Sequence, residues 1–263
     1  MDHALTNDGP AEGQVALFRL LARLRDRFRE SSRTLPDGSW RRWLIALGIG
    51  FAFCMGITWF ATWLGERLSD SGKLAWETGV IRGLEDDRLL SFHDATWLQA
   101  FGSSAMMVPI VVLAAGWAAW VRRPIRAAGV VAAFFTAKVL VFSGWSMWTR
   151  ARPDFINDGI GVPAGLGSYP SGHIVQLVAV YGLLFWFWVR ESRSRVEQGV
   201  AWLLLIVLIV ATGAARLRVG AHWPSDLVAG AVIGTALLIT VVVAERRAVG
   251  SPGLPPASPI RRP

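Results

Sequence analysis

Polar residues suited to phosphate chemistry gather in three short segments in the second half of this 263-residue chain. The first segment contains Arg152, and the second is a Pro-Ser-Gly-His run that ends at His173. The third contains Arg216, His222 and Asp226. Arginine presents a planar fork of donors that matches two phosphate oxygens, and histidine can attack phosphorus or transfer a proton. These residue types in this pattern predict a phosphate-handling site.

The spacing within the third segment indicates a role for each histidine. His222 and Asp226 are four residues apart, so the carboxylate can contact one ring nitrogen while the other faces phosphorus. A carboxylate in that place fixes the tautomer and stabilises the charge that develops on the ring during attack. We therefore predict His222 as the nucleophile and Asp226 as its orienting group. His173 remains to protonate the leaving oxygen and later to activate water.

Further donors are expected around the same anion. Ser171 is expected to cap the helix that follows it, and the Gly172 amide can point at the anion, because free N–H groups at a helix N-terminus attract anions. Glycine also lets a phosphate approach the backbone closely. Together with Arg152 and Arg216, these residues form the predicted phosphate cradle. No metal-ligand spacing accompanies them, so no metal or cofactor is predicted.

Membrane-spanning helices are the elements that must position these residues. The chain is 53% hydrophobic, only 17% charged and has a mean hydropathy of +0.41, whereas a soluble domain is about 25% charged. A span needs roughly 17–25 predominantly apolar residues. The apolar runs predict an all-α bundle of six transmembrane helices, at residues 43–64, 105–121, 127–148, 172–189, 196–215 and 227–244.

The distribution of basic residues predicts the orientation of the bundle, because Lys and Arg are retained on the cytoplasmic side. Most of the 27 Lys and Arg lie in residues 1–42, in the connections at 122–126 and 190–195, and in the C-terminal tail. Both termini are therefore predicted to be cytoplasmic. By parity, the third and fifth spans end, and the fourth and sixth begin, on the opposite side. All three polar segments are thus predicted on the extracytoplasmic face of a plasma (inner) membrane.

Three regions are predicted along the chain. Residues 1–42 form a basic cytoplasmic segment, unstructured to residue 13 and then an amphipathic helix at 14–33. Residues 43–245 form the membrane domain, whose long outer loop at 65–102 carries short interfacial helices over the site. Residues 246–263 form a disordered cytoplasmic tail rich in proline.

The net charge of +8 does not indicate a nucleic-acid partner. The basic residues are spread over four segments beside spans, whereas a nucleic-acid site gathers them into one patch or groove. Anionic lipid headgroups suit the observed distribution better, so membrane lipids are the predicted partners. Cys54 is the sole cysteine and lies within the first span, so no intramolecular disulfide is possible.

The three segments resemble the motifs of the type 2 phosphatidic acid phosphatase superfamily, which includes lipid phosphate phosphatases, vanadium haloperoxidases and bacterial glucose-type acid phosphatases. The resemblance covers about residues 76–244 and implies a membrane-bound member of bacterial type. It also implies a metal-independent reaction through a phosphohistidine on His222, with His173 as acid and then base. The matching residues are Arg152-Pro153, Pro170-Ser171-Gly172-His173, Arg216, His222 and Asp226.

Two positions depart from the family's pattern. The lysine of the first motif falls at Trp145, and the serine before the third-motif arginine falls at Ala215. Loss of one donor to a phosphoryl group can cost about 2.7–4 kcal/mol. Arg150, at the outer end of the third span, is the predicted substitute and a further phosphate-binding residue. Lys138 lies seven residues before Trp145, roughly 10 Å deeper at 1.5 Å per residue, and is not expected to reach the phosphate.

We therefore expect an enzyme that hydrolyses a lipid phosphate or diphosphate at the extracytoplasmic face. The expected substrate is of the polyprenyl diphosphate, phosphatidate or phosphatidylglycerophosphate type. Two alternatives stay open. One is transfer of the phosphoryl group to a sugar or lipid alcohol. The other is a non-catalytic protein that binds or transports lipid phosphates, because Trp145 replaces the expected lysine.

Overall fold

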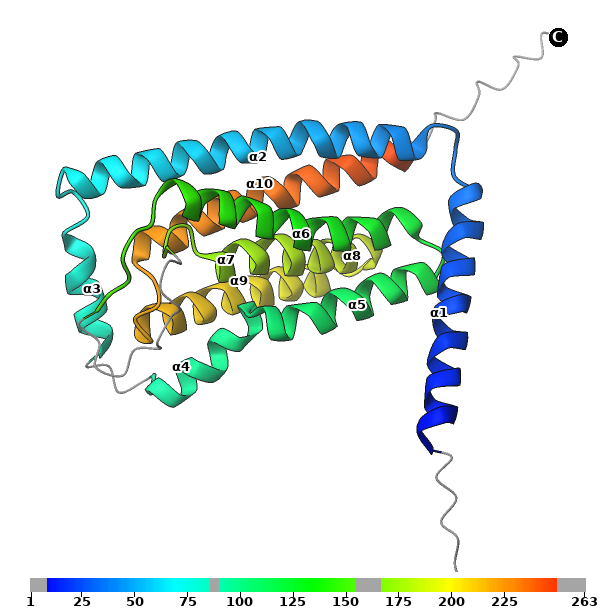
Figure 1. Cartoon of the computed structure of the whole chain (residues 1–263), viewed down its shortest axis with the longest axis horizontal. Helices are drawn as coiled ribbons and strands as arrows, with labels where there is room; N and C mark the ends of the chain where they lie inside the picture. The colour runs from blue at the N-terminus through cyan, green and yellow to red at the C-terminus, as the bar shows by residue number, and fades with distance from the viewer. Residues whose placement is uncertain (1–8, 86–89, 155–166, 250–263) are drawn as a thin grey trace, which may run out of the picture.

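The computed structural model describes residues 9–85, 90–154 and 167–249, and every regular element in these ranges is helical (Figure 1). Within these ranges, six helical segments are long and apolar enough to cross a membrane. The protein is a multi-pass membrane protein, and the predicted all-α bundle of six spans is confirmed. The spans are α2 (Ser39–Asp70), α4 with α5 (Phe92–Leu98 and Ser104–Trp120), α6 (Pro124–Met147), α7 to α8 (Gly172–Gln176 and Gly182–Glu191, joined by the π-helical turn Leu177–Tyr181), α9 (Arg195–Arg218) and α10 (Pro224–Val249).

Several helices extend beyond the predicted ends, because hydropathy marks only the part of a helix that lies in hydrocarbon. α2 begins at Ser39 and ends at Asp70. α10 continues to Val249, so the predicted tail does not begin at residue 246. α1 (Gly9–Arg33) begins within the segment predicted to be unstructured. Residues 1–8, 86–89, 155–166 and 250–263 lie outside the described residues, and the last of these ranges is most of the predicted tail.

The chain direction places the polar segments at one end of the bundle, as parity predicts. α6 and α9 end there, and α7 and α10 begin there (Figure 1). The outer-loop helices α3 (Trp76–Glu85) and α4 lie at this same end. α1 lies across the opposite end, roughly perpendicular to the spans. The bundle therefore has one end that carries the polar segments and another that carries the amphipathic helix.

Local sequence signals explain where several helices begin. The Ser91 hydroxyl accepts from the Asp94 backbone N–H at the start of α4, and the Ser103 hydroxyl accepts from Met106 N–H at the start of α5. Ser194 caps α9 in the same way. Pro124 is the first residue of α6, where its missing N–H would have no helical partner in any case.

α10 packs against α2, α6 and α7. Small residues let the backbones approach. A Cβ added at Gly50 of α2 would lie 2.2 Å from Cγ2 of Thr240, and one added at Gly234 would lie 2.8 Å from Cβ of Val178. Close approach of this kind is the usual basis of helix packing in membranes. It fixes α10, and with it the third polar segment, relative to the rest of the site.

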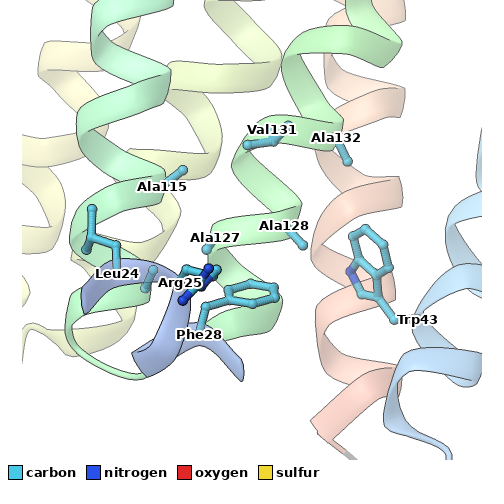
Figure 2. Close-up of a pocket in the computed structure, with 10 residues that line it drawn as sticks. Leu24, Arg25, Phe28, Trp43, Ala115, Ala127, Ala128, Val131 and Ala132 are labelled. Atoms are coloured by element: carbon cyan, nitrogen blue, oxygen red, sulfur yellow. The ribbon is translucent and has the colours of Figure 1, made fainter. Parts of the chain in front are cut away.

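α1 is docked onto the bundle by its apolar face. Leu24 and Phe28 pack against a cluster of buried alanines of α5 and α6, and Nη1 of Arg27 donates to the Trp120 carbonyl at 2.9 Å. An apolar pocket of about 540 Å³ lies beside this contact, between α1, α2, α5 and α6, with Trp43 and Val131 among its lining residues (Figure 2). The pocket is at the end of the bundle opposite to the polar segments.

Candidate active site

Helix ends bring the predicted catalytic residues together. His173 is the second residue of α7 and Asp226 the third of α10, so both lie beside the free N–H groups of a helix N-terminus. Arg216 lies in the last turn of α9, and Arg152 follows the end of α6. Cations in these places complement the helix dipole. The four residues come from four different spans or their ends.

The buried His222 ring contacts the carboxylate that is predicted to orient it. Its Nδ1 lies 3.3 Å from Oδ2 of Asp226, and the Trp223 backbone N–H donates to the same oxygen at 2.8 Å. His222 is only 1% exposed. Burial lowers the pKa of His222 to about 4, so the ring is neutral near pH 7. A ring held at Nδ1 leaves Nε2 available for attack on phosphorus.

The two arginines of the cradle are each anchored and each keep an unused donor. Nη1 of Arg152 donates to the Ala221 carbonyl, and Nη2 donates to the Gly167 carbonyl at 3.2 Å. Nη1 of Arg216 donates to Oε1 of Gln99. The Nε of both arginines is buried and has no hydrogen-bond partner among the described residues. Burial lowers the pKa of Arg152. A phosphate oxygen would satisfy donors that are otherwise costly to bury.

Ser171 occupies the N-cap position of α7, but its hydroxyl makes no capping hydrogen bond. The expectation that this side chain caps the helix is therefore wrong. Instead, the Ser171 backbone N–H donates to the Asp226 carbonyl at 3.0 Å, which ties the second segment to the third. The buried hydroxyl has no partner among the residues that the structure describes. It is thus a further unused group beside Gly172, whose amide is among the first of α7.

The loop that precedes α7 is held from several sides. The Tyr169 phenol donates to the Ala61 carbonyl of α2 at 2.8 Å, and burial raises the pKa of Tyr169 to about 12. The Trp145 indole of α6 donates to the Pro170 carbonyl at 3.1 Å. At the position of the family's lysine, the structure therefore has a side chain that anchors the Pro-Ser-Gly-His loop.

His173 lies against the turn that precedes α5. A Cβ added at Gly102 would lie 2.9 Å from Cβ and 3.2 Å from Cα of His173. Gly230 of α10 makes a similar approach, since its added Cβ would lie 2.9 Å from the Ser171 carbonyl oxygen. At both glycines, any residue with a Cβ would force the neighbouring atoms to move. His173 is thus packed directly against Gly102, while its neighbours Ser171 and Ile174 are packed against Gly230.

Arg150 does not lie where its predicted role requires. Its Nη1 donates to Oδ1 of Asp226 at 2.7 Å, and its Nη2 donates to Oε2 of Glu77 at 2.5 Å. Both terminal nitrogens are therefore engaged by buried carboxylates. Arg150 supports Asp226 from the side away from His222, and the structure gives no support to its prediction as a phosphate-binding substitute for the lysine. Proximity along the chain to Arg152 was the basis of that prediction, and it does not specify a partner.

Lys138 is the other cation that the sequence places near Trp145, the position of the family's lysine. Its Nζ donates to the Ser104 hydroxyl at the start of α5 at 2.5 Å. The second departure, Ala215, is fully buried and packs with Ala95 of α4. An apolar contact with an outer-loop helix thus replaces the family's serine at this position.

Two site residues were missed by the motifs, namely Glu77 and Gln99. Glu77 lies on α3 and is 0% exposed, and Gln99 is 7% exposed in the 3₁₀ turn Gln99–Gly102. Both belong to the outer loop. Their only sequence signal is a polar residue within an apolar stretch of that loop, and solvated loop residues give the same signal.

The comparisons with known proteins agree with this arrangement. The model of the PAP2 superfamily matches residues 126–249, a range that contains all three polar segments. This part of the chain, a little under half of its length, is thus similar to the PAP2 superfamily. The identification from the motifs, as a membrane member of bacterial type, is thereby confirmed.

Two relatives of this protein have names that specify lipid phosphatases. Phosphatidylglycerophosphatase B of Bacillus subtilis (strain 168) is 25% identical over 149 residues, which cover 56% of this chain and 71% of that protein. A lipid A 1-phosphatase of Rhizobium etli is 33% identical over 108 residues, which cover 37% of this chain and 41% of that protein. The match therefore spans about two fifths of the lipid A 1-phosphatase.

A solved structure shares the fold of this protein. It is the first transmembrane PAP2 type phosphatidylglycerolphosphate phosphatase from Bacillus subtilis, with a TM-score of 0.62 and 20% identity. The likeness covers 72% of this chain and 94% of that one. At this level of identity the likeness concerns the fold alone.

Proposed function

We propose that this protein removes a phosphate from a lipid phosphate or diphosphate through a phosphohistidine on His222. The observation that carries the proposal is the buried pair of His222 and Asp226, 3.3 Å apart, in a site with two arginines whose Nε atoms have no partner among the described residues. The family and the names of the relatives confirm the prediction of a lipid phosphatase as the class of enzyme. The extracytoplasmic face of a plasma (inner) membrane is the proposed location, on the distribution of basic residues.

The membrane setting and the relatives support the proposed range of substrates. Phosphatidylglycerophosphate and lipid A carry their phosphate on a lipid that lies in the bilayer, and polyprenyl diphosphates and phosphatidate share that property. The site lies at the ends of spans, where a lipid headgroup would be. The proposed substrate class is therefore a membrane lipid with a terminal phosphate or diphosphate group.

In the first step, Nε2 of neutral His222 attacks phosphorus and a P–N bond forms. The P–O bond to the leaving oxygen breaks, and His173 donates a proton to that oxygen. Arg152 and Arg216 bind the non-bridging oxygens, with the Ser171 hydroxyl as a further donor. Asp226 stabilises the charge that develops on the His222 ring.

In the second step, water attacks the phosphorus of the phosphohistidine. His173, now neutral, accepts a proton from that water. The P–N bond breaks, its electron pair returns to His222, and inorganic phosphate is released. An alcohol in place of water would give phosphoryl transfer by the same steps.

Phosphate release by the purified protein from a panel of lipid phosphates and diphosphates, in the presence of a chelator, tests the proposal. Brief incubation with a lipid whose terminal phosphate is labelled should place the label on the protein, and His222→Ala should abolish it. Label in a sugar or lipid alcohol would indicate the transferase. If no phosphate is released and the protein is not labelled, the result would indicate a non-catalytic lipid-phosphate-binding protein. Activity that disappears with chelator would contradict the metal-independent reaction.

A further inference from the structure

A carboxylate outside the three motifs reaches the site from the outer-loop helix α3. Glu77 is fully buried, and its Oε1 accepts from the Ser225 backbone N–H at 2.7 Å. This N–H is one of the free groups at the N-terminus of α10, next to Asp226. The other oxygen, Oε2, accepts from Nη2 of Arg150 at 2.5 Å. Glu77 therefore ties α3 both to the first turn of α10 and to the segment after α6.

Arg150 bridges Glu77 and Asp226, which are both 0% exposed. Its Nη1 donates to Oδ1 of Asp226 at 2.7 Å and to the Ser225 hydroxyl at 2.8 Å. Its guanidinium also lies over the rings of Trp148 and Trp223, at 5.2 Å from each centroid. These contacts fix the guanidinium plane, so that one terminal nitrogen faces Asp226 and the other faces Glu77.

The bridge constrains the carboxylate that orients the nucleophile. The terminal torsion of an aspartate is soft, so a single contact with His222 would leave the carboxylate plane free to turn. Here Oδ1 is held by Arg150, while Oδ2 faces His222 and accepts from the Trp223 backbone. Each oxygen has its own partners. Arg150 therefore fixes the carboxylate plane of Asp226 from the side opposite His222, and with it the direction of the His222 ring.

Charge supports the same interpretation. An ionised carboxylate that is completely buried beside a neutral histidine needs a compensating cation. Arg150 supplies that cation to Asp226, and Glu77 accepts a hydrogen bond from its other terminal nitrogen, Nη2. A single guanidinium between two carboxylates is bound more rigidly than it would be by Asp226 alone.

We propose that Glu77 and Arg150 are positioning residues that hold Asp226, and through it His222, in the orientation for attack. The proposal rests on the proposed function for its kinetic consequences. The proposal adds a residue of α3 to those that support the active site. Glu77 lies outside the range 126–249 that the family model matches. The outer loop is thus part of the apparatus that orients the nucleophile.

Glu77→Gln and Arg150→Lys test the pair with little change in volume. The amide cannot accept from both Ser225 and Arg150, and the lysine keeps the charge but cannot bridge two carboxylates. Each variant should lower kcat about 10- to 100-fold with KM within about twofold of wild type, as expected when substrate binding is retained. In an Asp226→Asn background neither should cause a further loss, because both act through Asp226. Arg152→Lys, which acts on the phosphate, should add its loss to that of Asp226→Asn.

A spectroscopic measurement tests the same idea without turnover. The chain has four histidines, so ¹⁵N-histidine spectra of the purified protein can be assigned with single His→Gln variants. The wild-type His222 should show one tautomer, with the proton on Nδ1. Glu77→Gln and Arg150→Lys should give a mixture of tautomers. Thr78→Val, which changes the adjacent residue of α3, is the matched control and should leave both kcat and the His222 signal unchanged.

Two results would overturn the proposal. One is kcat and a His222 spectrum that stay at wild-type values in both variants. The other is a loss in Arg150→Lys that adds fully to that of Asp226→Asn and raises KM, which would mean that Arg150 binds the phosphate directly. A wild-type protein that is inactive on every lipid phosphate, but whose His222 tautomer responds to both variants, would reject the proposed function and leave the positioning role intact.

Discussion

Asp226 and His222 face each other across 3.3 Å, from Oδ2 to Nδ1, and both side chains are buried. In the proposed mechanism this contact keeps the proton on Nδ1 of His222. It also directs the other nitrogen away from the carboxylate. The proposed reaction therefore depends on a contact between two residues that are four positions apart in the chain.

Asp226→Asn should retain the shape of the site and lose the preference for one tautomer. We expect kcat to fall about 1,000-fold or more, by analogy with the orienting acid of a catalytic triad. KM should change little, because the carboxylate does not contact the phosphate. Initial rates of phosphate release measure the effect. Asp26→Asn, at an exposed position of α1, is the control and should be neutral. A loss of less than tenfold would show that the carboxylate is not required.

The pH dependence should reflect the buried state of His222. Its pKa is lowered to about 4 by burial, with Arg152 and Arg216 acting in the same direction and Asp226 opposing them. The nucleophile must be neutral, so its contribution to kcat/KM should stay constant as the pH falls through 6.5 and decline only near 4. Because the unfolded chain binds that proton already near 6.5, stability should also fall between these values. Assays after return to pH 7 separate the two effects. A nucleophile limb near 6.5 in the phosphohistidine-trapping rate would contradict the assignment.

Arg216→Lys should weaken the cradle, because an ammonium cannot replace the planar fork that binds Gln99 and, in the proposed mechanism, a phosphate oxygen as well. Loss of one preorganised donor costs about 100-fold or more in kcat. Arg123→Lys, at an exposed position at the other end of the bundle, is the matched control. The ratio of the two variants' kcat/KM measures the contribution of the fork. Equal values would exclude Arg216 from phosphate binding.

Gly102→Ala should displace His173, since the added methyl group would lie 2.9 Å from Cβ of the histidine. A displacement of a catalytic group by about 1 Å can cost on the order of 100-fold in rate. Gly48→Ala provides the comparison, because no atom lies within 4 Å of its added Cβ. Thermal unfolding measured together with kcat should show a larger effect on turnover than on stability for Gly102→Ala alone.

The proposed orientation can be tested with single cysteines. Ser71→Cys lies just after α2 at the site end, and Ser194→Cys lies before α9 at the other end. An impermeant thiol reagent added outside intact cells should label the first and not the second. The wild-type protein is the blank, because its Cys54 is buried. Labelling of Ser194→Cys alone would reverse the orientation.

The three motifs could be located from the sequence because alternate spans return to the same surface. Parity alone brings Arg152, His173, Arg216 and Asp226 to one end, whatever the details of packing. The spacing of four residues between His222 and Asp226 adds a local contact across the start of α10. These predictions needed no knowledge of which span packs against which.

Predictions that depended on tertiary partners did worse. Arg150 was placed on the phosphate because of its position in the chain, but its partner Glu77 is on another helix, more than seventy residues away. Ser171 was expected to cap α7, yet its hydroxyl makes no capping bond, and its backbone N–H instead donates to the Asp226 carbonyl of α10. Composition gives no sign that Glu77 is buried. Packing of the outer-loop helices decides this, and neither hydropathy nor periodicity describes it.

The position of α1 has a consequence for the site at the far end of the molecule. A helix that lies across one end of a bundle, with its apolar face docked on that bundle, resists both tilting and sinking of the spans. The length of the spans then fixes the distance between α1 and the predicted phosphate cradle. Anchoring of α1 in one leaflet would thereby set the depth of His222 relative to the headgroups of the opposite leaflet. This depth would decide which lipid phosphates can reach His222.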